Sequence, residues 1–153
     1  MQSLESLLAD HPFFRDLPPQ HLPTIAGCGR NVHFRPGEFV FRAGEDAAEL
    51  FLVRHGRVAL EIAAPGRPPI IIQTVGAGEI LGWSWLIPPY RRAFDARVIE
   101  DTRAIAFDAV CIRRKCDADH DLGYEMLKRL AQIMEERLEA ARIQLLDLYG
   151  TQP

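Results

Sequence analysis

The chain has 153 residues, of which 48% are hydrophobic and 25% charged, and its net charge is −3. This balance suits one soluble globular domain with its own core, and the slight acidic excess argues against a domain whose main task is to grip nucleic acid. No apolar run approaches the roughly 18 residues of a membrane-spanning helix, and the N-terminus lacks the basic start of a signal peptide, so we expect a cytoplasmic protein without membrane contact.

The first segment, residues 1–28, has a helical pattern. Ser3 is placed to cap one short helix, and Pro18–Leu22 begins a second.

The second segment, residues 30–107, carries turn signals at short intervals between β-rich runs. The expected strands include 50–54, 57–62, 70–75, 96–99 and 103–107. His55-Gly56 reads as the two-residue loop of a hairpin, and 96–99 is expected to pair with 103–107 across the three residues between them. This pattern predicts a mainly β fold with flanking helices, a double-stranded β-helix of the jelly-roll type.

Residues 79–86 interrupt the β pattern and are predicted to form a short helix with Gly78 at its N-cap. The start of a helix leaves several backbone N–H groups without partners, and these donors favour an anion.

The third segment, residues 108–149, is predicted to be helical: a short helix at 108–115, then a long one that Asp119 or Asp121 caps. Apolar residues recur along the long helix at steps of three and four: Leu127, Leu130, Met134, Leu138, Ala141, Leu145 and Leu148. This nearly heptad pattern favours a two-fold homodimer through the helix, with packing against its own domain as the alternative.

Cys28, Cys111 and Cys116 are an odd number of cysteines at irregular spacing, without a C-x-x-C pair. We therefore expect no disulfide framework and no zinc site, and we interpret them as small buried residues in a reducing compartment. The five histidines form no H-x-H or H-E-x-x-H pattern, so we expect neither a metal cofactor nor an enzyme.

Several motifs resemble one family, and they follow in its order: Phe34-Arg35-Pro36-Gly37-Glu38, Ala43-Gly44-Glu45, Leu50-Phe51-Leu52-Val53, Gly56-Arg57-Val58, Gly76-Ala77-Gly78-Glu79 and Ala96 to Val98. The chain resembles the cyclic nucleotide-binding domain family of catabolite activator protein-like sensors. The resemblance implies one domain over 1–153, an eight-stranded β-roll with a phosphate-binding cassette at 78–93, and a long C-terminal helix that forms the dimer in the bacterial regulators.

The resemblance also implies the site, with cyclic AMP or cyclic GMP as the expected ligand and no other cofactor. Glu79 matches the family residue that accepts a hydrogen bond from the ribose 2′-hydroxyl, and Arg92, or else Arg91, matches the arginine that neutralises the cyclic phosphate. Arg137 on the long helix could reach the base or be a solvated charge. The expected ligand-binding residues are Gly78, Glu79, Ile80, Leu81, Arg91, Arg92 and Ala93.

Three residues depart from the family pattern. Ala93 stands where bacterial members have Ser or Thr, Phe94 where a small residue is usual, and Asp95 adds a negative charge. Without a ligand role, Glu79 is a helix-start charge, and the arginine pair bonds to Asp95 or Glu100. Trp83 and Trp85 either wall the pocket or cover the β-roll.

Two functions follow from these observations. The chain is expected to be a stand-alone sensor that binds a cyclic nucleotide and relays the signal through its C-terminal helix. Because it stops at Pro153, just past that helix, we expect no DNA-binding domain within it, and the output passes through a protein partner or the dimer. The alternative is a degenerate fold that serves as a dimerisation or protein-interaction module without nucleotide binding.

Overall fold

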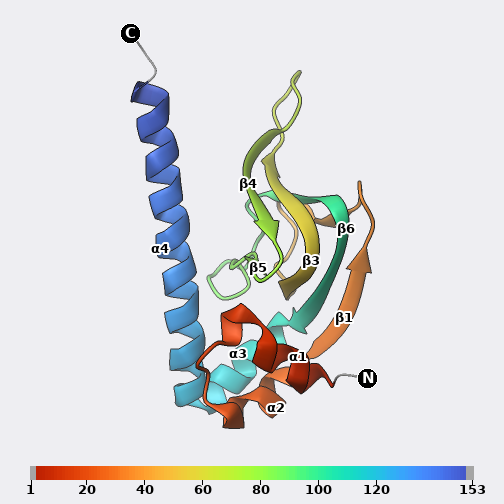
Figure 1. Ribbon diagram of the computed structural model, residues 1–153, viewed down its shortest axis with the longest axis vertical. Helices are drawn as coiled ribbons and strands as arrows, with labels where there is room; N and C mark the ends of the chain where they lie inside the picture. Colours follow the sequence, from red (N-terminus) through yellow and green to blue (C-terminus); the bar gives the residue numbers. More distant parts are fainter. Residues whose placement is uncertain (1–2, 151–153) are drawn as a thin grey trace.

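The computed structural model describes residues 3–150, and Figure 1 shows how the elements are arranged. The elements are α1 (Leu4–Asp10), η1 (Pro12–Phe14), η2 (Pro19–His21), α2 (Leu22–Ala26), β1 (Gly29–Phe34), β2 (Phe39–Phe41), β3 (Glu49–Ile62), β4 (Ile70–Gly76), β5 (Ile80–Leu81), β6 (Asp95–Asp108), α3 (Ala109–Ala118) and α4 (His120–Gly150). The N-terminal helices and α3 gather at one end of the sheet, whereas α4 runs along its length (Figure 1). The predicted fold class, β-rich with flanking helices and a long C-terminal helix, is confirmed.

All the strand pairs in the described sheet are antiparallel, and its central path runs β1-β6-β3-β4. The two long strands, β3 and β6, pair from Glu49 with Asp108 to Glu61 with Asp95. β2 adds to β6 and β5 adds to β3. The long β3–β6 ladder is therefore the frame from which the shorter strands and the segment 78–93 are placed.

The predicted hairpin at His55-Gly56 is wrong, because β3 runs straight through these residues. The β3–β6 register shifts on both sides of them, so they form a bulge and not a turn. Gly56 has φ +103°, and a Cβ atom there would lie 2.7 Å from the Cα atom of Thr102 on β6. Glycine is needed here because the two strands approach so closely. The predicted pairing of 96–99 with 103–107 is also wrong, because both segments belong to the single continuous strand β6.

The predicted helix over 79–86 is also wrong. β5 occupies its first residues and pairs with β3, and left-handed glycines flank β5 at Gly78 (φ +85°) and Gly82 (φ +83°). The N–H of Gly78 donates to the carbonyl oxygen of Val53 at 2.9 Å. Long-range pairing with β3 thus overrides the local helical signal, and the argument for an anion at a helix start no longer applies.

The predicted helix caps at Ser3 and Asp119 are confirmed. The side chain of Ser3 accepts from the N–H of Ser6, and Asp119 accepts from the first turn of α4. Asp108 caps α3 by accepting from the N–H of Cys111 at 2.8 Å.

No helix among residues 3–150 is both long and apolar enough to cross a membrane.

Two apolar clusters form the core. One joins the terminal helices to one part of the sheet and contains the fully buried Trp85, and the other fills the β-roll around Val58 and Val98. α4 contributes to the first cluster only through its N-terminal half, with Leu122, Met126 and Leu130. Its C-terminal half is exposed.

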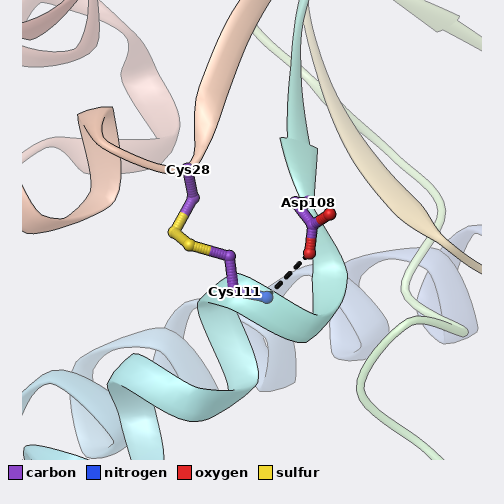
Figure 2. Close-up of a disulfide and its surroundings, with 3 residues drawn as sticks. All are labelled: Cys28, Asp108 and Cys111. Carbon is purple, nitrogen blue, oxygen red and sulfur yellow. Dashed lines mark hydrogen bonds between the residues drawn. A yellow bond between two sulfur atoms is a disulfide. The ribbon is translucent and has the colours of Figure 1, made fainter.

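Cys28 and Cys111 form a disulfide, which corrects the expectation that no cysteines pair (Figure 2). They are 83 residues apart in sequence, but the β1–β6 ladder ends with Gly29 opposite Phe107 and so brings the two Cα atoms to 5.7 Å. That separation is typical of disulfides. Sequence spacing carried no sign of this pairing, because it depends on strand register. Cys116 remains a free thiol.

Candidate functional site

Arg92 is a buried cation with incomplete partners. Only 4% of the residue is exposed. Its Nη2 donates to the carbonyl oxygen of Glu49, and its guanidinium lies over the ring of Phe41 at 4.1 Å from the centroid. Its Nε and Nη1 have no hydrogen-bond partner among residues 3–150. Such a group is costly to bury unless an anion completes its hydrogen bonds.

Burial lowers the pKa of Arg92 to about 10, and the nearby carboxylates of Glu49 and Glu45 partly oppose this effect. The guanidinium therefore keeps its charge at neutral pH. The site presents a desolvated positive charge with two free donor atoms, which is the arrangement that binds phosphate or carboxylate groups strongly.

A second guanidinium reaches the same place from α4. Arg137 donates from Nη2 to the carbonyl oxygen of Ile80 at 2.7 Å and lies over the ring of Trp83 at 4.6 Å from the centroid. Its Nη1 is buried without a partner in the described chain. Burial lowers the pKa of Arg137, and the carboxylates of Glu79 and Glu136 partly oppose this.

The two guanidinium groups line one small pocket of about 70 Å³. Its other lining residues are Phe41, Leu60, Gln73, Gly82, Trp83, Ser84, Ala93 and Phe94. One water needs about 10–15 Å³ on such a measure, so the pocket holds a group of phosphate size. Glycine is favoured at position 82 in its wall because φ there is +83°, and an added Cβ atom would also lie 2.8 Å from Nη1 of Arg92.

Glu79 faces a second, larger cavity of about 420 Å³. Gly78 and Ile80 line it together with one face of α4. The Oε1 atom of Glu79 accepts from the N–H of Gly76 at 3.0 Å, which fixes the carboxylate at the cavity edge. Arg137 and Gln73 line both cavities, so the two cavities are neighbours.

The remaining predicted site residues lie in different places. Ala93 lines the small pocket, whereas Leu81 is 1% exposed and belongs to the core of the β-roll. Arg91 is exposed and donates to the carbonyl oxygen of Gly44 at 3.1 Å, beside Asp46. The structure thus separates the two arginines and directs only Arg92 inward.

The structure also decides the alternatives for the neighbouring residues. Asp95 accepts from the N–H of Ala43 and from Arg42, and neither Arg91 nor Arg92 bonds to it. Phe94 and Trp83 wall the small pocket, whereas Trp85 is core.

Phe41 and Gln73 line the small pocket, but they were not predicted as pocket residues. No motif includes them, and only strand pairing brings them beside Arg92. Within residues 3–150, no group of three or more His, Cys, Asp or Glu side chains is placed to hold a metal ion.

Comparison with known proteins identifies relatives of this arrangement. A family model described as the cyclic nucleotide-binding domain matches residues 31–119. A CRP-like cAMP-activated global transcriptional regulator of Mycobacterium tuberculosis is 24% identical over 148 residues, which cover 97% of this chain and 64% of that protein. The chain therefore spans less than two thirds of this relative's length.

Solved structures show the same fold. One from Geobacter metallireducens, named for cyclic nucleotide binding, is 27% identical with a TM-score of 0.79, and the match covers 90% of this chain and 99% of that one. The regulatory domain of Toxoplasma gondii PKA, solved with cAMP, is 20% identical with a TM-score of 0.71, and the match covers 87% of this chain and 49% of that one.

Proposed function

The chain belongs to the cyclic nucleotide-binding domain family, and from this premise we propose that it is a sensor domain that binds cyclic AMP or cyclic GMP beside Arg92 and Arg137. The observation that carries the proposal is that two guanidinium groups, of the buried Arg92 and the partly buried Arg137, line one pocket. Each has a buried nitrogen that lacks a partner among residues 3–150. A cyclic phosphate supplies the missing acceptors and the missing charge in one group. We assign the domain no catalytic step and place it in the cytoplasm.

The two cavities suggest how such a ligand lies. The phosphate bonds to Nε and Nη1 of Arg92 in the small pocket, and the ribose and base extend past Arg137 into the larger cavity. Glu79 then accepts the ribose hydroxyl at the edge of that cavity, with Gly78, Ile80 and Ala93 forming the walls. Arg91 and Leu81 have no contact role in this arrangement.

Arg137 also provides the relay. It belongs to α4, yet it bonds to Ile80 of the segment 78–93. A ligand that enters between the two cavities competes for this guanidinium and so alters the contact between α4 and the segment. If α4 has one position with this contact and another without it, a ligand that binds more tightly to one of the two states raises the population of that state.

The exposed face of α4 supports a homodimer as the output. Its exposed large apolar residues include Leu127, Met134, Leu138, Ile143, Leu145, Leu146 and Leu148. Only Leu130 of the predicted heptad pattern is buried in its own domain, with 2% exposed. An apolar stripe of this length on one helix is typical of a helix–helix interface, and we propose a second copy of this chain as the partner.

Calorimetric titration with cyclic AMP and cyclic GMP tests the proposal. We expect micromolar binding of at least one nucleotide, loss of binding in Arg92→Ala, and at least tenfold weaker binding in Glu79→Ala. Arg91→Ala is the matched control, because this neighbouring arginine is exposed, and it should bind as the wild type does.

The second candidate is an interaction module without nucleotide binding. Two observations favour it: the pocket at Arg92 is only about 70 Å³, and Glu79 faces a different cavity. A wild-type protein that forms a dimer but gives neither heat of binding nor a thermal shift with either nucleotide would establish the module and exclude the sensor.

A further inference from the structure

The Cys28–Cys111 disulfide joins two parts of the chain that meet at the base of α4. Cys28 lies between α2 and β1, and Cys111 lies in the first turn of α3, just after the capping residue Asp108 (Figure 2). Cys28 is 9% exposed, and Cys111 is partly exposed at the protein surface. Cys111 is therefore the more exposed residue of the pair.

A second contact holds the other end of α3 to the same N-terminal unit. Asp119, between α3 and α4, pairs with the buried His21 at 3.7 Å. The segment that contains η2 and α2 is thus attached to α3 at two places. The disulfide joins it to the first turn of α3, and the His21–Asp119 contact joins it to the residue that follows α3.

The α3–α4 contact transmits any movement of α3 directly. A Cβ atom at Gly123 of α4 would lie 3.2 Å from the carbonyl oxygen of Cys116 on α3. The two helix backbones therefore pack closely, and we expect a shift of α3 to displace the N-terminal turns of α4. Arg129 and Arg137 follow on the same helix.

Contacts other than the disulfide also hold the base of α3. The N–H of Asp108 donates to the carbonyl oxygen of Cys28 at 2.9 Å, and the N–H of Ala109 donates to Ala48 at 2.9 Å. The buried side chains of Ile25 and Ile112 belong to one cluster with Trp85. Because these contacts remain when the sulfur–sulfur bond opens, we expect the domain to stay folded on reduction, while α3 loses one of its constraints.

We propose that the Cys28–Cys111 disulfide is a reversible tether that sets how firmly α3, and through it α4, is held against the N-terminal helices. Disulfides are usually either permanent in an oxidising compartment or transient and redox-sensing in a reducing one. The partial exposure of Cys111, together with the other contacts that hold the base of α3, points to the second kind.

The opening reaction is thiol–disulfide exchange with a dithiol. One thiolate of the dithiol attacks the sulfur of Cys111, and Cys28 leaves as a thiolate that takes up a proton. The second thiol of the dithiol then attacks the mixed disulfide and releases Cys111 as a thiol. Two electrons and two protons pass from the dithiol to the cysteine pair. A small disulfide such as oxidised glutathione closes the tether by the reverse exchange.

Cys116 provides the internal control. It lies on the same helix as Cys111 and is half-buried, and burial raises the pKa of its thiol. It therefore stays protonated and reacts slowly. The variant Cys116→Ser should respond to a dithiol as the wild type does.

Hydrogen exchange measured by mass spectrometry on the full chain, without nucleotide, tests the tether. The protein is compared as purified under oxidising conditions, after dithiothreitol, and after re-oxidation with oxidised glutathione, and alkylation counts the free thiols. We expect one free thiol before reduction and three after it. We also expect at least tenfold faster exchange in α3 and the first turns of α4 after reduction, unchanged exchange in β3, and full recovery on re-oxidation.

Two results would overturn the proposal. A bond that dithiothreitol opens only in denaturant is a permanent staple, and a bond that opens in the native protein without faster exchange in α3 is no tether. Should Cys111→Ser fail to fold, the reduced wild type still gives the answer. Because no nucleotide is present, either outcome is independent of whether the pocket at Arg92 binds one.

Discussion

Arg92 and Arg97 lie five residues apart, yet their surroundings differ, and we expect their replacement to affect the stability of the protein differently. Arg97 donates from Nε and Nη2 to both carboxylate oxygens of Glu61, a residue that is 3% exposed, and this pairing raises the pKa of Arg97. Arg92 is more deeply buried and has only one acceptor for its guanidinium among residues 3–150.

Replacing each arginine by methionine should therefore separate a ligand-binding residue from a structural one. We expect Arg92→Met to leave the free energy of unfolding, without ligand, within about 1 kcal/mol of the wild type or above it, because an unsatisfied buried charge is removed. Arg97→Met should cost about 2 kcal/mol, because it leaves the carboxylate of Glu61 buried without its partner. Urea denaturation measures both. A large loss in Arg92→Met would show that this arginine is a structural residue.

His11 predicts the pH dependence of stability. It is buried, its Nε2 lies 3.2 Å from the carbonyl oxygen of Val53, and its Nδ1 accepts from the N–H of Phe13. Burial lowers the pKa of His11 below its ordinary value of 6.5. The unfolded chain then binds a proton more readily than the native protein once the pH falls below about 6.5.

The contribution of His11 to the free energy of unfolding should consequently be fully present above pH 6.5. It should decline as the pH falls below that value toward the pKa of His11 in the native protein. We expect the variant His11→Asn to show a shallower decline between pH 7.5 and pH 5 in thermal melts. Parallel declines in the variant and the wild type would assign the pH dependence to other groups.

At the level of the secondary-structure elements, the close pairing of β3 with β6 requires a glycine at position 56. Gly56 combines a left-handed backbone with a close approach to β6, whereas Gly44 has φ +87° with open space around it. We expect Gly56→Ala to cost about 3 kcal/mol or more and Gly44→Ala only about 1–2 kcal/mol, because only the first adds a steric collision to the backbone penalty. Chemical denaturation of both variants gives the difference. Equal costs would contradict the assignment of a tight β3–β6 crossing at Gly56.

The elements also show what the sequence could predict. The helix caps at Ser3 and Asp119 depend on residues three or fewer positions away, and the local pattern predicted them, apart from the choice between Asp119 and Asp121. The segment after Gly78 depends on Val53, and the sequence-based helix there was wrong. Local signals predicted elements whose hydrogen bonds are local and failed where a distant strand supplied the partner.

In the candidate site, too, local motifs could be predicted from the sequence, whereas contacts between distant segments could not. The motif residues Glu79 and Arg92 were recognisable from the sequence. The outward position of Arg91 was not, because it depends on pairing with Asp46 and on a hydrogen bond to Gly44, which are distant in sequence. The disulfide is the clearest case, because strand register alone brings Cys28 to Cys111.

At the scale of the whole molecule, the proposed dimer predicts a contrast along α4. Leu138 is 53% exposed and Leu130 is 2% exposed, although both belong to the same heptad-like pattern. We expect Leu138→Glu to keep its circular dichroism spectrum but to sediment as a monomer, whereas the wild type sediments as a dimer. Leu130→Glu should instead lose its folded spectrum, because it places a charge in the core. A wild-type protein that is monomeric at about 100 μM would contradict the dimer.

The central claim is that the free nitrogens of Arg92 take a phosphate, and a crystal structure grown with saturating cyclic AMP or cyclic GMP tests it most directly. The claim predicts a phosphate oxygen at about 2.7–3.2 Å from Nε or Nη1 of Arg92, with Arg137 displaced from Ile80. A nucleotide bound elsewhere while those nitrogens stay unpaired, or an empty pocket at saturating concentration of both nucleotides, would contradict it.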